Sequence, residues 1–202
     1  MRILILSGGK GEGILPLTKF HPKILTSIHG KTFLHYLLRL HRKHDIVLSV
    51  GHMSDSIKTW CKDNDSWPEY VTEPFELGTG GAVLFAQPFL KNNRYFAVIN
   101  GDTFIHKVKL PDLYSRLKDD AGVVYAPDMV DNKVKRAGIF FFKHKCWEKF
   151  STVSKATPNT PIMLDTLLSL VPYTRIEIKQ HFLDIGTHHG LKLAKSTHFI
   201  QE

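Results

Sequence analysis

Short apolar runs that end in polar, glycine-containing segments constrain the fold of this chain more than any other feature. Residues 2–6, 46–50 and 95–99 are such runs, and they end at Ser7-Gly8, Gly51 and Asn100-Gly101. Runs of this length are typical of buried strands. Residues 32–43, with apolar side chains at helical spacing, and residues 79–86, directly after a glycine, are expected to be helices. The alternation predicts an α/β fold, a three-layer sandwich with a mainly parallel, mixed sheet of Rossmann-like type.

The rest of the chain is expected to continue this pattern less regularly. Further strands are predicted at 70–72, 122–126, 137–142, 175–178 and 182–186, and further helices at 55–61, 161–171 and 187–196. Residues 8–22 contain several glycines and prolines and are expected to form a long loop. The 202 residues contain no linker-like segment, which favours a single domain spanning 1–202.

Composition and charge narrow the function classes. The formal charge is +8, but the basic residues are scattered and accompany no nucleic-acid motif, so we expect small phosphorylated ligands and no nucleic acid. The apolar start of the chain ends at Ser7, which is too short for a signal peptide or a membrane span. Two widely separated cysteines favour free thiols in a reducing compartment. A cytoplasmic location without membrane association is therefore expected, and a homodimer is left open.

Two glycine-rich segments are candidates for binding an anion. Gly8, Gly9 and Gly11 follow the first predicted strand, where backbone N–H groups can approach a phosphate closely. The segment fits neither the Walker A loop nor the G-x-G-x-x-G fingerprint, and a flexible turn is the alternative interpretation. Residues 73–82 contain a second glycine-rich stretch that opens a helix, whose N-terminal dipole favours a polar ligand. A capped tight loop is the alternative there.

Two aspartates follow predicted strands. Asp102 comes directly after the run 95–99, and Asp184 lies in a similar setting near the end of the chain. Magnesium prefers one or two carboxylates together with substrate phosphates, so both residues are candidate Mg²⁺ ligands. The alternative is that each aspartate only forms a turn.

Four ordered segments together resemble the sugar-1-phosphate nucleotidyltransferases. The family opening, Leu-Ala-Gly-Gly-x-Gly-Thr-Arg-Leu-x-Pro-Leu-Thr followed by Pro-Lys, is similar to residues 6–18 and 22–23 here. Residues 77–82, 100–103 and 184–187 match the later motifs. The branch that the chain resembles most is that of the guanylyltransferases acting on heptose 1-phosphate or mannose 1-phosphate. The resemblance implies the nucleotide-diphospho-sugar transferase fold.

The resemblance also implies a reaction and its site. A sugar 1-phosphate attacks the α-phosphorus of a nucleoside triphosphate, with GTP favoured, and pyrophosphate leaves with the help of Mg²⁺. Lys23, Asp102 and Lys10 would be catalytic, and Asp102 and Asp184 would hold the metal. Gly80, Gly138 and Asp184 would lie near the sugar. The implied nucleotide-binding residues are Leu6, Ser7, Gly8, Gly9, Gly11, Glu73, Gly78, Thr79, Asn100 and Gly101.

Two departures from the family pattern support an alternative. Glu12-Gly13 stands where the family has Thr-Arg, and the family's Glu-Lys pair has no clear counterpart. Lys133, Lys135 and Arg136 are candidates to contact the sugar phosphate instead. The alternative is a weak or inactive homologue that binds a nucleotide or nucleotide sugar as a sensor or regulatory partner. If turnover is slow only because the arginine is missing, the double change Glu12→Thr and Gly13→Arg is expected to raise the rate.

Overall fold

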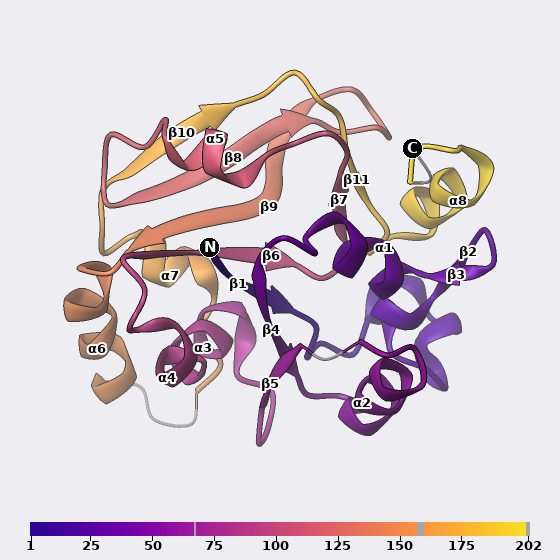
Figure 1. Ribbon diagram of the computed structural model, residues 1–202, viewed down its shortest axis with the longest axis horizontal. Helices are drawn as coiled ribbons and strands as arrows, with labels where there is room; N and C mark the ends of the chain where they lie inside the picture. Colours follow the sequence, from indigo (N-terminus) through magenta and orange to yellow (C-terminus); the bar gives the residue numbers. More distant parts are fainter. Residues whose placement is uncertain (67, 157–159, 201–202) are drawn as a thin grey trace.

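A seven-stranded mixed sheet forms the centre of the protein. The computed structural model describes residues 1–66, 68–156 and 160–200, and the sheet order is β10-β8-β9-β6-β1-β4-β5 (Figure 1). The strands are β1 (Arg2–Leu6), β4 (Asp45–Val50), β5 (Glu69–Thr72), β6 (Tyr95–Asn100), β8 (Ala121–Pro127), β9 (Val134–Lys143) and β10 (Tyr173–Glu177). The expected α/β class with a mainly parallel, mixed sheet is confirmed.

The order of the strands creates a site at one edge of the sheet. β1 pairs in parallel with β4 on one side and with β6 on the other, and β4 pairs in parallel with β5. β9 runs antiparallel between β6 and β8. The carboxyl ends of β1, β4, β5 and β6 therefore meet at one edge. The chain leaves β1 toward β4 and later returns to its other side at β6, and ligands of open α/β sheets bind at such switch points.

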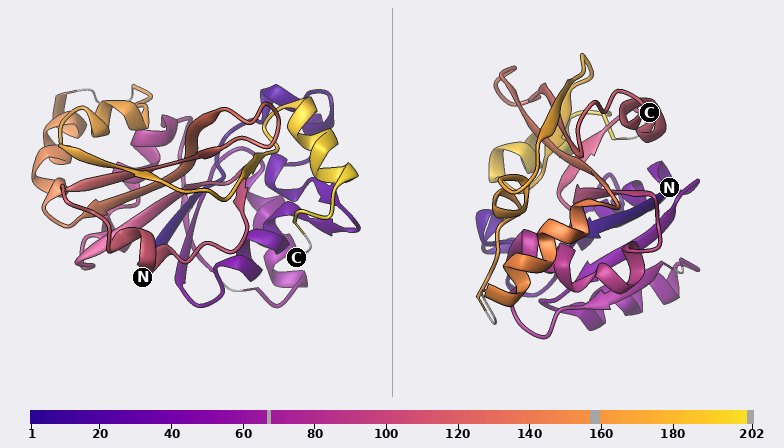
Figure 2. Two further views of the ribbon diagram at one scale, coloured as in Figure 1. Left: turned by 90° about the horizontal axis from the view of Figure 1, so that it is seen from above. Right: turned by 90° about the vertical axis from the view of Figure 1, so that its left-hand side faces the viewer.

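Helices cover both faces of the sheet (Figures 1 and 2). Alternate residues of β1 separate the two cores, because Ile3 and Ile5 pack with one buried cluster and Leu4 with the other. The first cluster includes buried residues of α1, α2 and α8, and the second those of α3, α4, α6 and α7. The helices are α1 (Phe33–Leu40), α2 (Ser54–Asp63), α3 (Gly78–Phe85), α4 (Gln87–Leu90), α5 (Leu110–Tyr114), α6 (Cys146–Ala156), α7 (Leu164–Leu168) and α8 (His188–Ser196).

A small antiparallel pair brings the two predicted metal-binding segments together. β7 (Thr103–Ile105) pairs with β11 (Phe182–Asp184), with Asp184 opposite Thr103. The backbone N–H of Ile185 donates to the carbonyl of Asp102 at 2.9 Å. Segments 80 residues apart in sequence are thus adjacent at the carboxyl end of β6. A second short pair, β2 (Ser27–Ile28) with β3 (Lys31–Thr32), precedes α1.

Several expected elements differ from the observed ones. The helix predicted at 161–171 is wrong at both ends: helix α7 runs only from Leu164 to Leu168. It begins late because the Ile162 backbone pairs with Leu77 and with α3. α4, α5, α6 and β7 were not expected. The predicted long loop contains two short 3-10 helices, at Glu12–Ile14 and Leu17–Lys19, and a third, at Lys23–Leu25, follows it. Across the described ranges, no helix is long and apolar enough to cross a membrane.

Candidate active site

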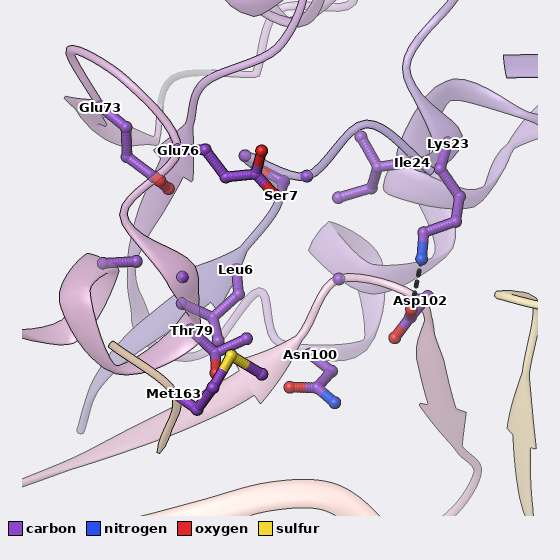
Figure 3. Close-up of a pocket in the computed structure, with 15 residues that line it drawn as sticks. Leu6, Ser7, Lys23, Ile24, Glu73, Glu76, Thr79, Asn100, Asp102 and Met163 are labelled. Atoms are coloured by element: carbon purple, nitrogen blue, oxygen red, sulfur yellow. Dashed lines mark hydrogen bonds and ion pairs between the residues drawn. The ribbon is translucent and has the colours of Figure 1, made fainter. Parts of the chain in front are cut away.

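A cavity of about 290 Å³ lies at the carboxyl ends of β1, β5 and β6 (Figure 3). Its walls come from three segments that sequence alone singled out, the glycine loop after β1, the loop before α3 and the turn after β6. The predicted residues that line it are Leu6, Ser7, Gly8, Gly9, Lys23, Glu73, Gly78, Thr79, Asn100, Gly101 and Asp102. Ile24, Glu76, Ala82 and Met163 also line it and were not predicted. Glu76 and Ala82 lie inside the glycine-rich segment 73–82, whereas nothing near Met163 in sequence pointed to the cavity.

Gly11 shapes the loop that carries the catalytic candidate Lys23. Gly11 has φ +71, and its carbonyl accepts a 2.8 Å hydrogen bond from the Thr18 hydroxyl. A Cβ at this position would lie 2.8 Å from Thr18 Cγ2 and 3.0 Å from Lys23 Cβ. Gly11 therefore lets the loop fold tightly against the Lys23 segment, and it is not among the residues that line the cavity.

Lys23 and Asp102 line one end of the cavity, and Asp184, which is not among the lining residues, lies beside them. Lys23 Nζ lies 2.5 Å from Asp102 Oδ2, and both side chains are largely buried (Figure 3). A Cβ placed on Gly186 would lie 2.8 Å from Asp184 Oδ1, 3.1 Å from Asp102 Oδ2 and 3.4 Å from Lys23 Nζ. All three charged groups thus surround the Cα of Gly186. The ion pair between Lys23 and Asp102 joins segments 79 residues apart, and the sequence did not indicate it.

The environment of Asp184 favours its protonated form. Burial raises the pKa of this carboxyl to about 6, and the neighbouring charge of Asp102 adds to the rise. The N–H of Gly186, which donates to Asp184 Oδ1 at 2.6 Å, and the charge of Lys23 act in the opposite direction. One ammonium group is therefore too little to balance two adjacent carboxylates. A divalent cation, which prefers oxygen ligands, would fit this donor set. Across the described residues, no group of three or more histidine, cysteine, aspartate or glutamate side chains could hold a metal.

Glu73 occupies the other end of the cavity. Its Oε1 accepts a 2.7 Å hydrogen bond from the buried hydroxyl of Ser49, which sequence analysis did not single out. A Cβ on Gly8 would lie 2.3 Å from the same oxygen, so the carboxylate packs directly against the glycine loop. Burial raises the pKa of Glu73, while its hydrogen bonds with Ser49 and the Leu77 backbone lower it.

Lys10 is not among the residues that line the cavity, but it pairs with Glu76, which is. Its Nζ lies 3.0 Å from Glu76 Oε2, and more than half of each side chain is exposed. This ion pair joins the glycine loop to the loop before α3, and the hydrogen bond to Glu76 raises the pKa of Lys10. Lys10 is thus close to the site but bound to a carboxylate, an arrangement that the sequence did not indicate.

The N-terminus of α3 is less open to a ligand than the sequence suggested. The N–H groups of Gly80 and Gly81 both donate to the carbonyl of Ile162, at 2.7 and 3.0 Å. The Thr79 hydroxyl accepts from the Leu164 N–H at 2.9 Å. A Cβ on Gly80 would lie 2.5 Å from the Met163 carbonyl oxygen. Gly80 therefore serves close packing, and its predicted contact with the sugar finds no support in this position.

Gly138 also lies behind the cavity. It has φ +64, and a Cβ there would meet Thr103 Oγ1 at 2.6 Å and Asn100 Cβ at 3.1 Å. Asn100 lines the cavity, so Gly138 supports a cavity residue from β9. Gly138 is not among the residues that line the cavity, and its contact with the sugar stays a prediction.

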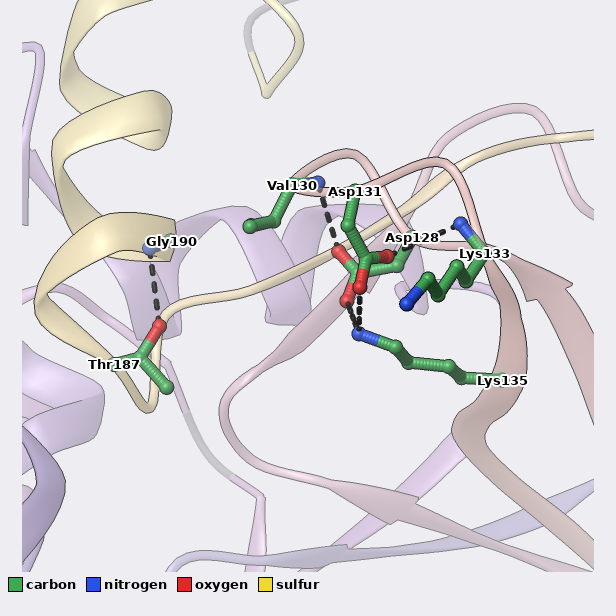
Figure 4. A network of polar contacts seen from close by, with 7 residues as sticks. All are labelled: Asp128, Val130, Asp131, Lys133, Lys135, Thr187 and Gly190. Carbon is green, nitrogen blue, oxygen red and sulfur yellow. Dashed lines mark hydrogen bonds and ion pairs between the residues drawn. The ribbon is translucent and has the colours of Figure 1, made fainter.

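Two basic residues of β9, Lys135 and Arg136, are engaged with acidic partners. Lys135 Nζ lies 2.8 Å from Asp128 and 2.8 Å from Asp131, and these bonds raise its pKa to about 12 (Figure 4). Arg136 forms an ion pair with Asp165. Lys135 and Arg136, two of the three residues predicted to contact the sugar phosphate, therefore already form ion pairs within the protein.

Position 13 cannot accommodate the arginine of the family motif. A Cβ on Gly13 would lie 2.2 Å from the carbonyl oxygen of Gly186. Because that carbonyl belongs to the backbone beside Asp184, a side chain at position 13 would displace the turn that holds the carboxylate cluster. The double change Glu12→Thr and Gly13→Arg is therefore not expected to raise the rate.

Curated proteins are similar in sequence to part of this chain. "Bifunctional protein GlmU" of Methanococcus maripaludis is 38% identical over 104 residues, which cover 50% of this chain and 25% of that protein. A D-glycero-alpha-D-manno-heptose 1-phosphate guanylyltransferase of Campylobacter jejuni is 34% identical over 119 residues, 54% of this chain and 53% of the relative. The chain thus spans a quarter to a half of the length of these curated relatives.

The fold extends further than the sequence likeness. The crystal structure of HddC from Yersinia pseudotuberculosis superposes with a TM-score of 0.76 over 96% of this chain and 98% of that one, at 24% identity. At this identity the superposition shows the fold. The sequence model described as Nucleotidyl transferase matches residues 2–133, which include the glycine loop, Glu73 and Asp102. Since that match covers more than half of the sequence, the chain belongs to the nucleotidyl transferase family.

Proposed function

We propose that the protein transfers a nucleotidyl group from a nucleoside triphosphate to a sugar 1-phosphate, forming a nucleotide sugar and releasing pyrophosphate. GTP is the favoured triphosphate, and a heptose or hexose 1-phosphate is the favoured acceptor. The observation that carries the proposal is the convergence of Lys23, Asp102 and Asp184 beside a glycine-lined cavity. We expect the product to serve the synthesis of cell-surface polysaccharides.

Asp102 and Asp184 would together hold Mg²⁺. When bound, the cation would neutralise charge on the phosphates. The raised pKa of Asp184 supports a cation at this position. Two neighbouring carboxylates repel each other when both are ionised, and a cation bound between them would remove that repulsion.

The reaction needs little covalent chemistry from the protein. An oxygen of the sugar phosphate forms a bond to the α-phosphorus, and the bond from that phosphorus to the β-phosphate oxygen breaks as pyrophosphate leaves. Such displacements depend on positioning and charge neutralisation. Lys23 would contact the reacting phosphates by exchanging its ion pair with Asp102 for one with the substrate. Ser7, Gly8 and Gly9 would lie along the nucleotide, where small residues allow close approach.

Glu73 would recognise the base. An ionised carboxylate accepts a pair of hydrogen bonds from adjacent donors, and guanine presents N1–H and N2–H₂ side by side. Burial raises the pKa of Glu73, so this acceptor is costly to keep charged in the empty cavity and gains from paired donors. This argument favours guanine over bases without that donor pair.

A second function has its own supporting observations. Lys10 is paired with Glu76, and Gly13 cannot be an arginine, so the side that faces the leaving group is short of free positive charge. A protein of this kind can bind a nucleotide or nucleotide sugar and turn it over slowly or not at all. It would then act as a sensor or a regulatory partner.

One assay separates the two functions. Pyrophosphate release is measured with each common triphosphate paired with heptose, mannose or glucose 1-phosphate, with and without Mg²⁺. The transferase proposal expects Mg²⁺-dependent release, highest with GTP, and none from Asp102→Asn. Calorimetric binding of GTP without any release supports the second function, and tighter binding of UTP, CTP or dTTP contradicts the choice of guanine.

The cellular setting is part of the proposal. Cys61 and Cys146 are free and buried, which suits a reducing compartment such as the cytoplasm. The substrates are small phosphorylated molecules, and a homodimer is tested by measuring the mass of the protein in solution.

A further inference from the structure

We infer that Ser49 is a positioning residue that selects the base by fixing the carboxylate of Glu73. The inference rests on the proposed role of Glu73 in recognising a base. Ser49 lies at the end of β4, and its hydroxyl donates to Glu73 Oε1 at 2.7 Å. It acts through Glu73, because it is not among the residues that line the cavity.

The position of Ser49 in the sheet makes its hydroxyl informative. Val47, two residues earlier on the same face of β4, belongs to the apolar cluster under α3, while Ser49 is 0% exposed. Burying a hydroxyl costs free energy unless it is hydrogen-bonded. Across the described residues, the hydrogen bond of this hydroxyl is the one to Glu73. The buried Ser49 hydroxyl therefore depends on the Glu73 carboxylate for its hydrogen bond.

The backbone of Ser49 is itself held firmly. Its carbonyl accepts from the Ser7 N–H at 2.9 Å and from the Ser7 hydroxyl at 2.6 Å. The next residue along β4, Val50, accepts from the Glu73 N–H at 2.8 Å. The donor and the carboxylate that it orients are therefore both anchored to the central sheet.

The remaining contacts leave Glu73 little freedom. Gly8 packs against Oε1, and the Leu77 backbone N–H hydrogen-bonds the carboxylate. The charged group that faces it from its own loop is Glu76, which is paired with Lys10 of the glycine loop. The hydrogen bond from Ser49 to Oε1 fixes the orientation of the Glu73 carboxylate. The lone pairs of Glu73 that Ser49 and Leu77 do not use are then available to a base. Removing the hydroxyl lets the carboxylate turn and removes a bond that favours its charged form.

The test compares Ser49→Ala, Glu73→Gln and the double variant by kcat/KM for GTP and ITP. ITP lacks the N2 amino group, so the GTP/ITP ratio reports the paired contact directly. Ser49→Ala is expected to lower this ratio about tenfold, the size of one hydrogen bond to a charged group, through KM with little change in kcat. In the double variant, Ser49→Ala should add almost nothing to Glu73→Gln. Ser49→Thr, which retains the hydroxyl, should restore most of the ratio.

A matched control separates positioning from general loss of packing. Thr26 is also buried, and its hydroxyl has no hydrogen-bond partner across the described residues. Thr26→Val should leave the GTP/ITP ratio unchanged. The inference is overturned if Ser49→Ala weakens every triphosphate equally, or if its effect adds fully to that of Glu73→Gln. If Ser49→Ala does not fold, Ser49→Cys is tested in its place. Its thiol is a weak donor, so its GTP/ITP ratio should lie between that of the wild type and that of Glu73→Gln.

The outcome distinguishes this inference from the proposed function. If the wild type prefers another base, guanine recognition fails, and the same cycle is run with the preferred triphosphate and its closest analogue. If the wild type binds nucleotide without turnover, calorimetric Kd values replace kcat/KM. Absence of binding to any triphosphate would overturn both.

Discussion

Gly13 and Gly186 touch through their backbones, since a Cβ on Gly13 would lie 2.2 Å from the Gly186 carbonyl oxygen. This contact joins the loop after β1 to the turn after β11. Gly186 in turn lies against Asp184, Asp102 and Lys23. The contact therefore connects the shape of the glycine loop to the placement of the charged cluster.

Any side chain at position 13 is expected to damage both stability and the site. Gly13→Ala should lower the free energy of unfolding by about 1–3 kcal/mol, as overpacking does, and Gly13→Arg should not raise turnover. Thermal unfolding and pyrophosphate release measure the two effects. Gly9→Ala is the control for the stability measurement alone, because a Cβ there has nothing within 4 Å but Gly9 lines the cavity. A Gly13→Arg variant that is as stable as the wild type and faster would contradict this view.

The sequence predicted the elements whose signals are local. The apolar runs gave β1, β4 and β6 to within a residue or so, and glycines marked the site loops. Helix 161–171 was overestimated because the Ile162 backbone bonds to Leu77 and α3, about 80 residues away. The pairs Lys23–Asp102, Ser49–Glu73 and Lys10–Glu76 were not predictable for the same reason. Each depends on which loops the sheet brings together.

The two aspartates should respond oppositely to neutralisation. Asp184→Asn should stabilise the protein at pH 7, whereas Asp102→Asn should destabilise it by roughly 1–2 kcal/mol because Lys23 loses its partner. Burial and Asp102 raise the pKa of Asp184 from 3.8 to about 6, so ionising it costs free energy that grows as pH rises through this range. The gain from Asp184→Asn should therefore reach at most about 3 kcal/mol at pH 7 and vanish near pH 4.

Thermal unfolding in the presence of a chelator, at pH 4 and pH 7, checks this pair. Both variants should also lose Mg²⁺-dependent pyrophosphate release. Equal stability losses in the two variants at pH 7 would show that Asp184 is not crowded by Asp102.

Lys10 should matter for turnover although it does not line the cavity. We expect Lys10→Ala to slow turnover about tenfold, or about 1.4 kcal/mol, because a charge near the leaving group is lost. The effect should be larger at low salt, since exposed charges are screened. Lys19→Ala is the control, because Lys19 lies over the Phe20 ring on the same loop, whereas Lys10 pairs with Glu76 of the cavity wall. Equal rates for Lys10→Ala and the wild type would remove Lys10 from the catalytic set.

His41 should make the protein sensitive to acid. It ends α1, is 5% exposed, and burial together with the nearby His44 lowers its pKa from 6.5 to about 4. The unfolded chain therefore binds a proton that the folded protein excludes, and stability falls as pH drops from 6.5 toward 4, by at most about 3 kcal/mol.

His41→Leu should flatten this part of the curve of unfolding free energy against pH, because leucine fills the buried position without titrating. His189→Leu, at an exposed position of α8, should leave the curve as in the wild type. Urea unfolding at half-unit steps of pH measures the slope, and an unchanged slope in His41→Leu would assign the acid sensitivity to other groups.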